Sequence, residues 1–200
     1  MLSDRRFPRR RVAVLLMALP IALPAYLGLG SNNASALNRL SSQGVRTQLT
    51  AGMKLQLRGA NVRASNVFVL GTRNGRRFYR IGISTGSSCF AVGRASAPRS
   101  RPFGLVLCDA TAGLSSQRPV MAWASVEGTQ RGVRRVNLRS IEGFATDDVV
   151  TVEFRDASGV VARTTVSGNI FSFSLPQVPS DSGHLVAKDS QGNTVYTEAF

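Results

Sequence analysis

Turn-forming residues recur about every ten positions in the last sixty residues, and this rhythm limits the fold more than any other feature. The turns are predicted at residues 156–159, 168–169 and 190–193, where Asp, Asn, Ser and Gly gather. The runs between them favour strands because they are rich in β-branched and aromatic residues. The predicted strands are residues 149–154, 160–166, 170–175, 184–188 and 194–199. Short strands joined by tight turns are typical of an antiparallel β-sandwich.

The first half of the body shows the same kind of pattern. Asn74-Gly75 separates two β-prone runs, residues 67–72 and 77–83, and predicts a hairpin because both turn residues tolerate a positive φ. Residues 53–58 alternate apolar and polar side chains, which predicts a strand with one buried face. Further strands are predicted at residues 47–49, 89–91, 104–107, 119–126 and 133–138. No long stretch has helical periodicity, so the expected fold class of the body is all-β.

The strand rhythm near the C-terminus resembles that of the small Ig-like or carboxypeptidase-regulatory-like β-sandwich modules of secreted bacterial proteins. The Cys…Trp…Cys pattern of true immunoglobulin domains is absent, so the resemblance implies a shape without a mechanism. The whole chain is also similar in layout to uncharacterised exported bacterial β-rich proteins. We expect residues 1–36 to form a leader with a linker, residues 37–130 a basic antiparallel β-module, and residues 131–200 an Ig-like sandwich.

Residues 12–30 contain no charged side chain, and five arginines lie among the residues before them. As a helix this run would be about 28 Å long, close to the ~30 Å hydrocarbon core of a bilayer. It is expected either to remain as a signal anchor or to be removed as a signal peptide after Ala36. Under both interpretations the positive-inside rule keeps the arginines in the cytoplasm. The body is therefore predicted to be extracytoplasmic, either anchored by a single pass or secreted after cleavage.

Cys89 and Cys108 are the only cysteines, and both follow the leader. A disulfide is expected because the predicted compartment permits oxidation. Closing a loop of about 20 residues should stabilise the fold by roughly 3 kcal/mol.

Charge is divided unevenly along the body. Residues 31–140 carry 17 basic side chains against two acidic ones, whereas residues 141–200 carry three against eight. Guanidinium groups pair well with phosphate and carboxylate, so arginines beside the predicted hairpin, between the cysteines and before the sandwich are candidate anion-binding residues. They are Arg73, Arg76, Arg77, Arg80, Arg94, Arg99, Arg101, Arg134 and Arg135. The alternative is that these arginines pair with the acidic sandwich or merely keep the protein soluble.

The compartment and the charge together suggest the partners. Outside the membrane the available polyanions are lipid head groups, wall polymers and acidic glycans, whereas nucleic acid is not expected there. We therefore expect a non-enzymatic binding or structural module that contacts the membrane and an anionic lipid or wall polymer. An alternative is the extracytoplasmic part of a signalling or assembly complex with another envelope protein.

One pattern resembles a hydrolase signature. Residues 82–86 read G-x-S-x-G around Ser84, and His184 follows later in the chain. The nucleophile elbow needs a helix after the serine, and this sequence continues as a β-prone run instead. A small envelope hydrolase using Ser84 or a carboxylate is therefore an alternative to the binding module. No cofactor and no metal are expected, since His184 is the only histidine.

Overall fold

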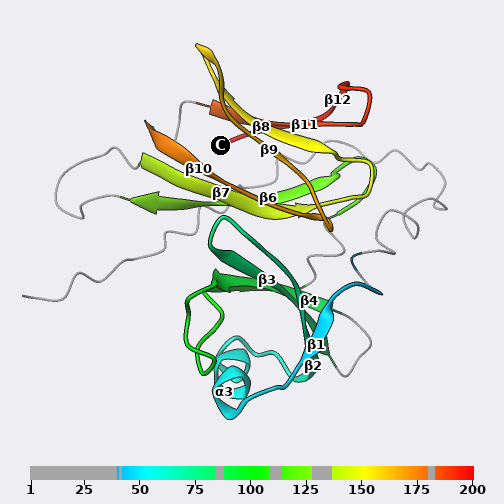
Figure 1. Cartoon of the computed structure of the whole chain (residues 1–200), viewed down its shortest axis with the longest axis vertical. Helices are drawn as coiled ribbons and strands as arrows, with labels where there is room; N and C mark the ends of the chain where they lie inside the picture. Colours follow the sequence, from blue (N-terminus) through cyan, green and yellow to red (C-terminus); the bar gives the residue numbers. More distant parts are fainter. Residues whose placement is uncertain (1–39, 41, 84–87, 109–113, 128–136, 180–182) are drawn as a thin grey trace, which may run out of the picture.

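The computed structural model describes residues 40, 42–83, 88–108, 114–127, 137–179 and 183–200. This part of the chain is mostly antiparallel β-structure, arranged as three sheets with the short helix α3 at one end (Figure 1). The predicted leader, Ser84, Arg134 and Arg135 lie outside the described residues. No helix within the described ranges has the length and apolar character needed to cross a membrane.

The first sheet, sheet A, has five antiparallel strands that follow one another in chain order. Its strands are β1 (Val45–Thr47), β2 (Ala64–Arg73), β3 (Arg76–Ile83), β4 (Ser88–Arg94) and β5 (Leu105–Leu107). The predicted hairpin is confirmed as β2 and β3, with Arg73 opposite Arg76. Asn74 and Gly75 have φ values of 48° and 71°, and these residue types adopt such values at little cost.

Helix α3 (Ala51–Gly59) replaces the strand predicted at residues 53–58, and that prediction is wrong. Thr50 caps the helix, because its side-chain oxygen accepts a hydrogen bond from the backbone N–H of Met53 at 3.2 Å. Met53 and Leu57 lie one helical turn apart and are buried, whereas Leu55 is 72% exposed. Met53 and Leu57 fit a helical period as well as an alternating one, so their spacing did not distinguish the two structures.

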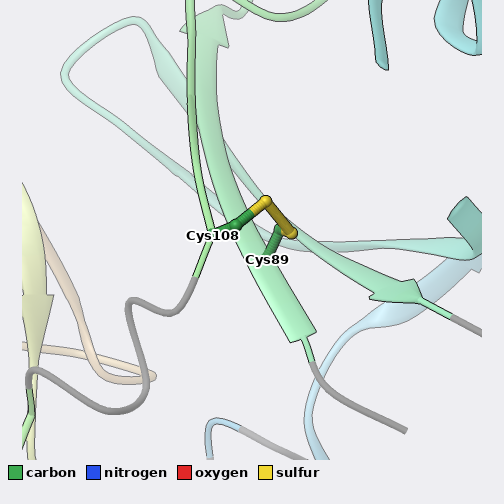
Figure 2. The surroundings of a disulfide bond; sticks show 2 residues. All are labelled: Cys89 and Cys108. Carbon is green, nitrogen blue, oxygen red and sulfur yellow. A yellow bond between two sulfur atoms is a disulfide. The ribbon is translucent and has the colours of Figure 1, made fainter. Parts of the chain in front are cut away.

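One face of sheet A packs against α3. Its buried cluster includes Met53 and Leu57 from the helix and Tyr79 and Ile81 from β3. Cys89 belongs to the same cluster and forms a disulfide with Cys108, just beyond β5 (Figure 2). The predicted disulfide is therefore confirmed, and it fastens the end of the short edge strand β5 to the interior strand β4.

The other described strands form two antiparallel sheets. Sheet B has the order β10-β7-β6, and sheet C has the order β12-β11-β8-β9. Their bounds are β6 (Val120–Glu127), β7 (Asn137–Ala145), β8 (Thr151–Asp156), β9 (Gly159–Thr165), β10 (Ile170–Pro179), β11 (Gly183–Lys188) and β12 (Thr194–Ala199). The two sheets share a buried core whose largest side chains are Phe154, Phe171 and Phe173. Each strand predicted after residue 149 overlaps one of β8 to β12.

Strand β6 links the two halves of the sequence. It pairs with β7 from Val120 opposite Ala145 to Glu127 opposite Asn137. The strand before the predicted boundary at residue 131 therefore shares a sheet with the strand after it. The strand predicted at residues 133–138 begins at Asn137 in the described chain and runs further than expected, to Ala145.

The second face of sheet A packs against sheet B, and we call this contact the seam. Its centre is aromatic, because the Phe144 ring lies 5.6 Å from Phe78, 4.8 Å from Phe90 and 5.7 Å from Trp123 between centroids. The buried residues of the seam are Leu40, Phe78, Phe90, Val92, Leu114, Phe144 and Ile170. Helix α3 and sheets A, B and C thus form successive layers (Figure 1).

Candidate anion-binding surface

Sheet A and α3 carry a strong excess of positive charge. Residues 43–107 contain eleven basic side chains and no Asp or Glu. Their charge is therefore not neutralised within this unit, and any counter-charge comes from elsewhere in the chain or from an external anion. The position of each arginine decides which of these applies.

Arg76 is paired with a carboxylate of sheet B. Its guanidinium lies 3.3 Å from the Glu142 carboxylate and donates a 2.6 Å hydrogen bond to the Ser125 hydroxyl. Ser125 and Ser140 in turn donate to the two oxygens of Glu142, at 3.2 and 3.0 Å. The Glu142 side chain is only 2% exposed and the Arg76 side chain is 24% exposed, so the carboxylate is buried and the guanidinium covers it from the edge of the seam. Arg76 is thus engaged within the molecule rather than offered to a ligand.

Arg80 is also engaged within the protein. Its guanidinium lies 4.0 Å from the centre of the Phe68 ring and donates to the backbone carbonyl of Gln43. Burial lowers the pKa of Arg80 from its ordinary value. On the opposite face of β3, burial raises the pKa of Tyr79, and the positive charge of Arg77 opposes that rise. The arginines of β3 therefore lie on both faces of sheet A, because successive residues of a strand face opposite sides of its sheet.

Arg94, Arg99 and Arg101 are exposed. They lie in and beside the loop between β4 and β5, where the Arg101 backbone N–H bonds to the carbonyl of Pro98 at 2.9 Å. Gly93 makes a close approach possible, since a Cβ atom there would collide with the carbonyl oxygen of Pro102. Three of the predicted anion-binding residues therefore present their charge to solvent, from the end of β4 and from the loop that follows it.

The loop is fastened to α3 by several polar contacts. The Gln56 side chain makes two hydrogen bonds to the backbone of Phe103, at 2.9 and 3.3 Å. Thr50 donates its hydroxyl to the Arg99 carbonyl at 3.3 Å. Gly52 lies so close to the backbone of Ser100 that a Cβ atom would meet it at 2.2 Å. Helix and loop consequently form one continuous surface.

That surface also contains two cations outside the set of predicted anion-binding residues. Lys54 and Arg58 are both exposed on α3. The strand prediction for residues 53–58 hid this arrangement, because alternation would have placed both side chains on the polar face of a sheet. The signal that could have revealed it was Thr50, a favourable N-cap residue directly before the run.

A second charged cluster lies on sheet C. Glu153 is buried and accepts ion pairs from Arg155 at 2.7 Å, from Arg163, and from Lys188 at 3.4 Å. Burial raises the pKa of Glu153, but hydrogen bonds from Arg155 and Lys188 and the charge of Arg163 lower it more. The result is a pKa below the ordinary value of 4.5. This cluster joins β8, β9 and β11, and its cations already share a carboxylate.

The described residues give no support to a metal site. Within the described ranges, no three His, Cys, Asp or Glu side chains gather as a metal would require. Asp147 accepts a 2.7 Å hydrogen bond from the Asn169 side chain, and Asp156 accepts from Ser158. His184 lies opposite Arg155 on β11. Since Ser84 is not described, the hydrolase alternative stays a prediction.

Comparisons of the chain with protein-family models, with curated proteins and with solved structures find no match. The resemblance of residues 131–200 to Ig-like modules therefore stays a prediction, and function has to be argued from the residues themselves.

Proposed function

We propose that this protein is a non-enzymatic binding or structural module held at the outer side of a membrane, where its basic unit contacts an anionic component of the cell envelope. The apolar run at residues 12–30 supports the location. The disulfide is in keeping with it, because such bonds persist in oxidising compartments. The C-terminal residues contribute an acidic-leaning β-sandwich, for which the Ig-like description is part of the proposal.

One observation carries this function: residues 43–107 bring eleven cations and no carboxylate into a single folded unit. Internal pairing uses part of that charge, as Arg76 and Arg80 demonstrate. The exposed cations on α3 and on the loop between β4 and β5 remain available to an anion. Arginine is suited to phosphate and carboxylate because its planar guanidinium donates two parallel hydrogen bonds.

The test is the salt dependence of binding by the full chain. The protein would be reconstituted into bilayer discs of zwitterionic lipid and mixed with a phosphate-bearing wall polymer or with anionic vesicles. Binding is expected at about 20 mM salt and should weaken at least ten-fold by about 200 mM, because exposed charges are screened within a Debye length of about 8–10 Å at 0.1–0.15 M.

Two variants assign the binding to the basic unit. Replacement of Arg94, Arg99 and Arg101 by Ser should weaken binding, because all three are exposed. Arg118→Ser is the control, since Arg118 is also exposed but pairs with Glu198 near sheet C. Absence of binding to either anion at low salt would overturn the proposed function.

The N-terminal residue of the mature protein tests the tether. Met1 at the N-terminus supports an uncleaved anchor, whereas Leu37 indicates cleavage.

A further inference from the structure

An apolar side chain stands exposed in the middle of the basic surface. Leu55 is 72% exposed on α3, although Met53 and Leu57 on the same helix are buried. Residues 51, 54, 55, 58 and 59 form the exposed arc of α3. With 100° between successive helical residues, Leu55 lies directly opposite the direction in which Met53 and Leu57 are buried. Leu55 also borders an open hollow lined by Gly52, Gln56, Ser100 and Arg101.

Cations flank Leu55 on two sides. Lys54 and Arg58 belong to the exposed arc of α3, and Arg99 and Arg101 come from the adjoining loop. We call these four cations together with Leu55 the α3 patch. The hydrogen bonds from Thr50 and Gln56 hold loop and helix together, so the patch is arranged before any ligand arrives.

We infer that the α3 patch docks on the surface of an anionic lipid bilayer, with Leu55 inserted below the head groups and the four cations on their phosphates. This inference rests on the proposed function and names its ligand. A wall polymer would satisfy the cations but would offer Leu55 nothing apolar, whereas a bilayer satisfies both. An exposed apolar side chain flanked by Lys and Arg is a composition that favours an interfacial position in anionic membranes.

The layered arrangement favours this orientation. Helix α3 lies at the end of the molecule away from sheet C (Figure 1). Residues 141–200, with three basic and eight acidic side chains, belong largely to sheets B and C. An anionic surface attracts the α3 end and repels the other. The nine residues between the expected anchor and Leu40 span at most about 30 Å, which keeps the body close to the bilayer.

The anchor and the patch are complementary. A single weak membrane contact is reversible, whereas the insertion of a transmembrane helix is effectively irreversible. Here the anchor keeps the patch at a high local concentration near lipid, so a modest docking equilibrium suffices to hold the body in one orientation. The patch therefore sets the orientation of the body, and the anchor sets its location.

The experiment places a fluorophore on the exposed arc without changing the patch. The full chain with Ala51→Cys, labelled with an environment-sensitive dye, would be reconstituted into discs of anionic or zwitterionic lipid carrying a quencher on the acyl chain. The paired native cysteines do not compete for the label. Quenching and a blue shift are expected in anionic discs only. The matched control is the same dye on Val45→Cys, because Val45 is 76% exposed on β1.

Two changes to the patch test its parts. Leu55→Ser should lower the docking equilibrium constant about ten-fold. Lys54→Ser with Arg58→Ser should lower it about 25-fold, since each cation near an anionic surface contributes about five-fold. Arg46→Ser with Arg118→Ser also replaces two exposed cations, one on β1 and one just before β6, and should change docking less than two-fold. A retained disulfide and an unchanged far-ultraviolet circular dichroism spectrum establish that each variant is folded.

The outcomes separate the inference from the proposed function. If the Ala51 probe stays in water in anionic discs while the protein still binds wall polymer, the inference is overturned and the proposed function stands. Docking that is insensitive to Leu55→Ser would likewise overturn the insertion. If neither lipid nor polymer binds at low salt, both fail.

Discussion

The ion pair between Arg76 and Glu142 makes a strong prediction about how sheets A and B are held together. Replacement of Arg76 by Met keeps most of the side-chain volume and removes the charge. The Glu142 carboxylate, 2% exposed, would then remain buried without its counter-ion. Removing one partner of a buried pair typically costs 3–5 kcal/mol, because the other charge stays desolvated and unpaired.

The structure places the expected cost at the lower end of that range. After the substitution the carboxylate keeps two hydroxyl donors, Ser125 at 3.2 Å and Ser140 at 3.0 Å. Hydrogen bonds to charged groups retain part of the lost stabilisation. We therefore expect the free energy of unfolding to fall by about 3 kcal/mol. For a body of this size the corresponding fall in Tm is about 6–12 °C.

Urea unfolding followed by tryptophan fluorescence measures this effect, since Trp123 packs on Phe144 in the seam. Arg94→Met is the matched control, because Arg94 lies opposite Arg76 on β4 and is exposed. It should change stability by less than about 0.5 kcal/mol. The double variant Arg76→Met with Glu142→Leu should recover most of the loss. A loss below 1 kcal/mol for Arg76→Met, or strict additivity in the double variant, would refute the reasoning.

Three further predictions concern stability. Non-reducing mass spectrometry should find Cys89 and Cys108 protected from alkylation, and their joint replacement by Ala should lower the free energy of unfolding by roughly 3 kcal/mol; labelling of either thiol in unreduced protein contradicts the disulfide. Thr50→Ala removes the cap of α3 and should cost about 1 kcal/mol in thermal unfolding, whereas no loss would mean that the cap is dispensable. Because the pKa of Glu153 in the folded protein lies below its ordinary value of 4.5, its contribution is complete above pH 4.5 and is lost as pH falls through the folded pKa. Glu153→Gln should therefore flatten the fall in stability between pH 5 and pH 3, and an unchanged pH profile would exclude this carboxylate as its cause.

Local signals predicted much of the fold. The turn at Asn74 and Gly75 was predictable because these residue types adopt positive φ values at little cost. A two-residue turn of this kind joins two neighbouring antiparallel strands. The strands of sheet C were predictable because each is bounded by turn residues close in sequence. The strand prediction for residues 53–58 failed because Met53 and Leu57 suit both a strand and a helix, and the capping hydrogen bond is made to Thr50, outside the run.

The candidate site was less predictable, since it depends on contacts between distant segments. The sequence grouped the arginines of the hairpin together, but β3 sends Arg76 and Arg77 to opposite faces of sheet A. Glu142, which pairs with Arg76, lies in a strand of another sheet. Even so, Arg99 and Arg101 of the α3 patch were among the residues predicted from sequence, because a Pro- and Ser-rich loop keeps its charges at the surface.

The burial of Leu40 has a mechanical consequence. A pull on the N-terminal segment reaches Leu40, fully buried in the seam, before it reaches β1. Strand β1 alone would resist poorly, because it pairs with β2 over only three residues and lies at a sheet edge. With Leu40 held between sheets A and B, the load is shared by both sheets. A pull from the N-terminal side is therefore resisted first by the contact between sheets A and B, and β1 is expected to peel from its sheet only after that contact has separated.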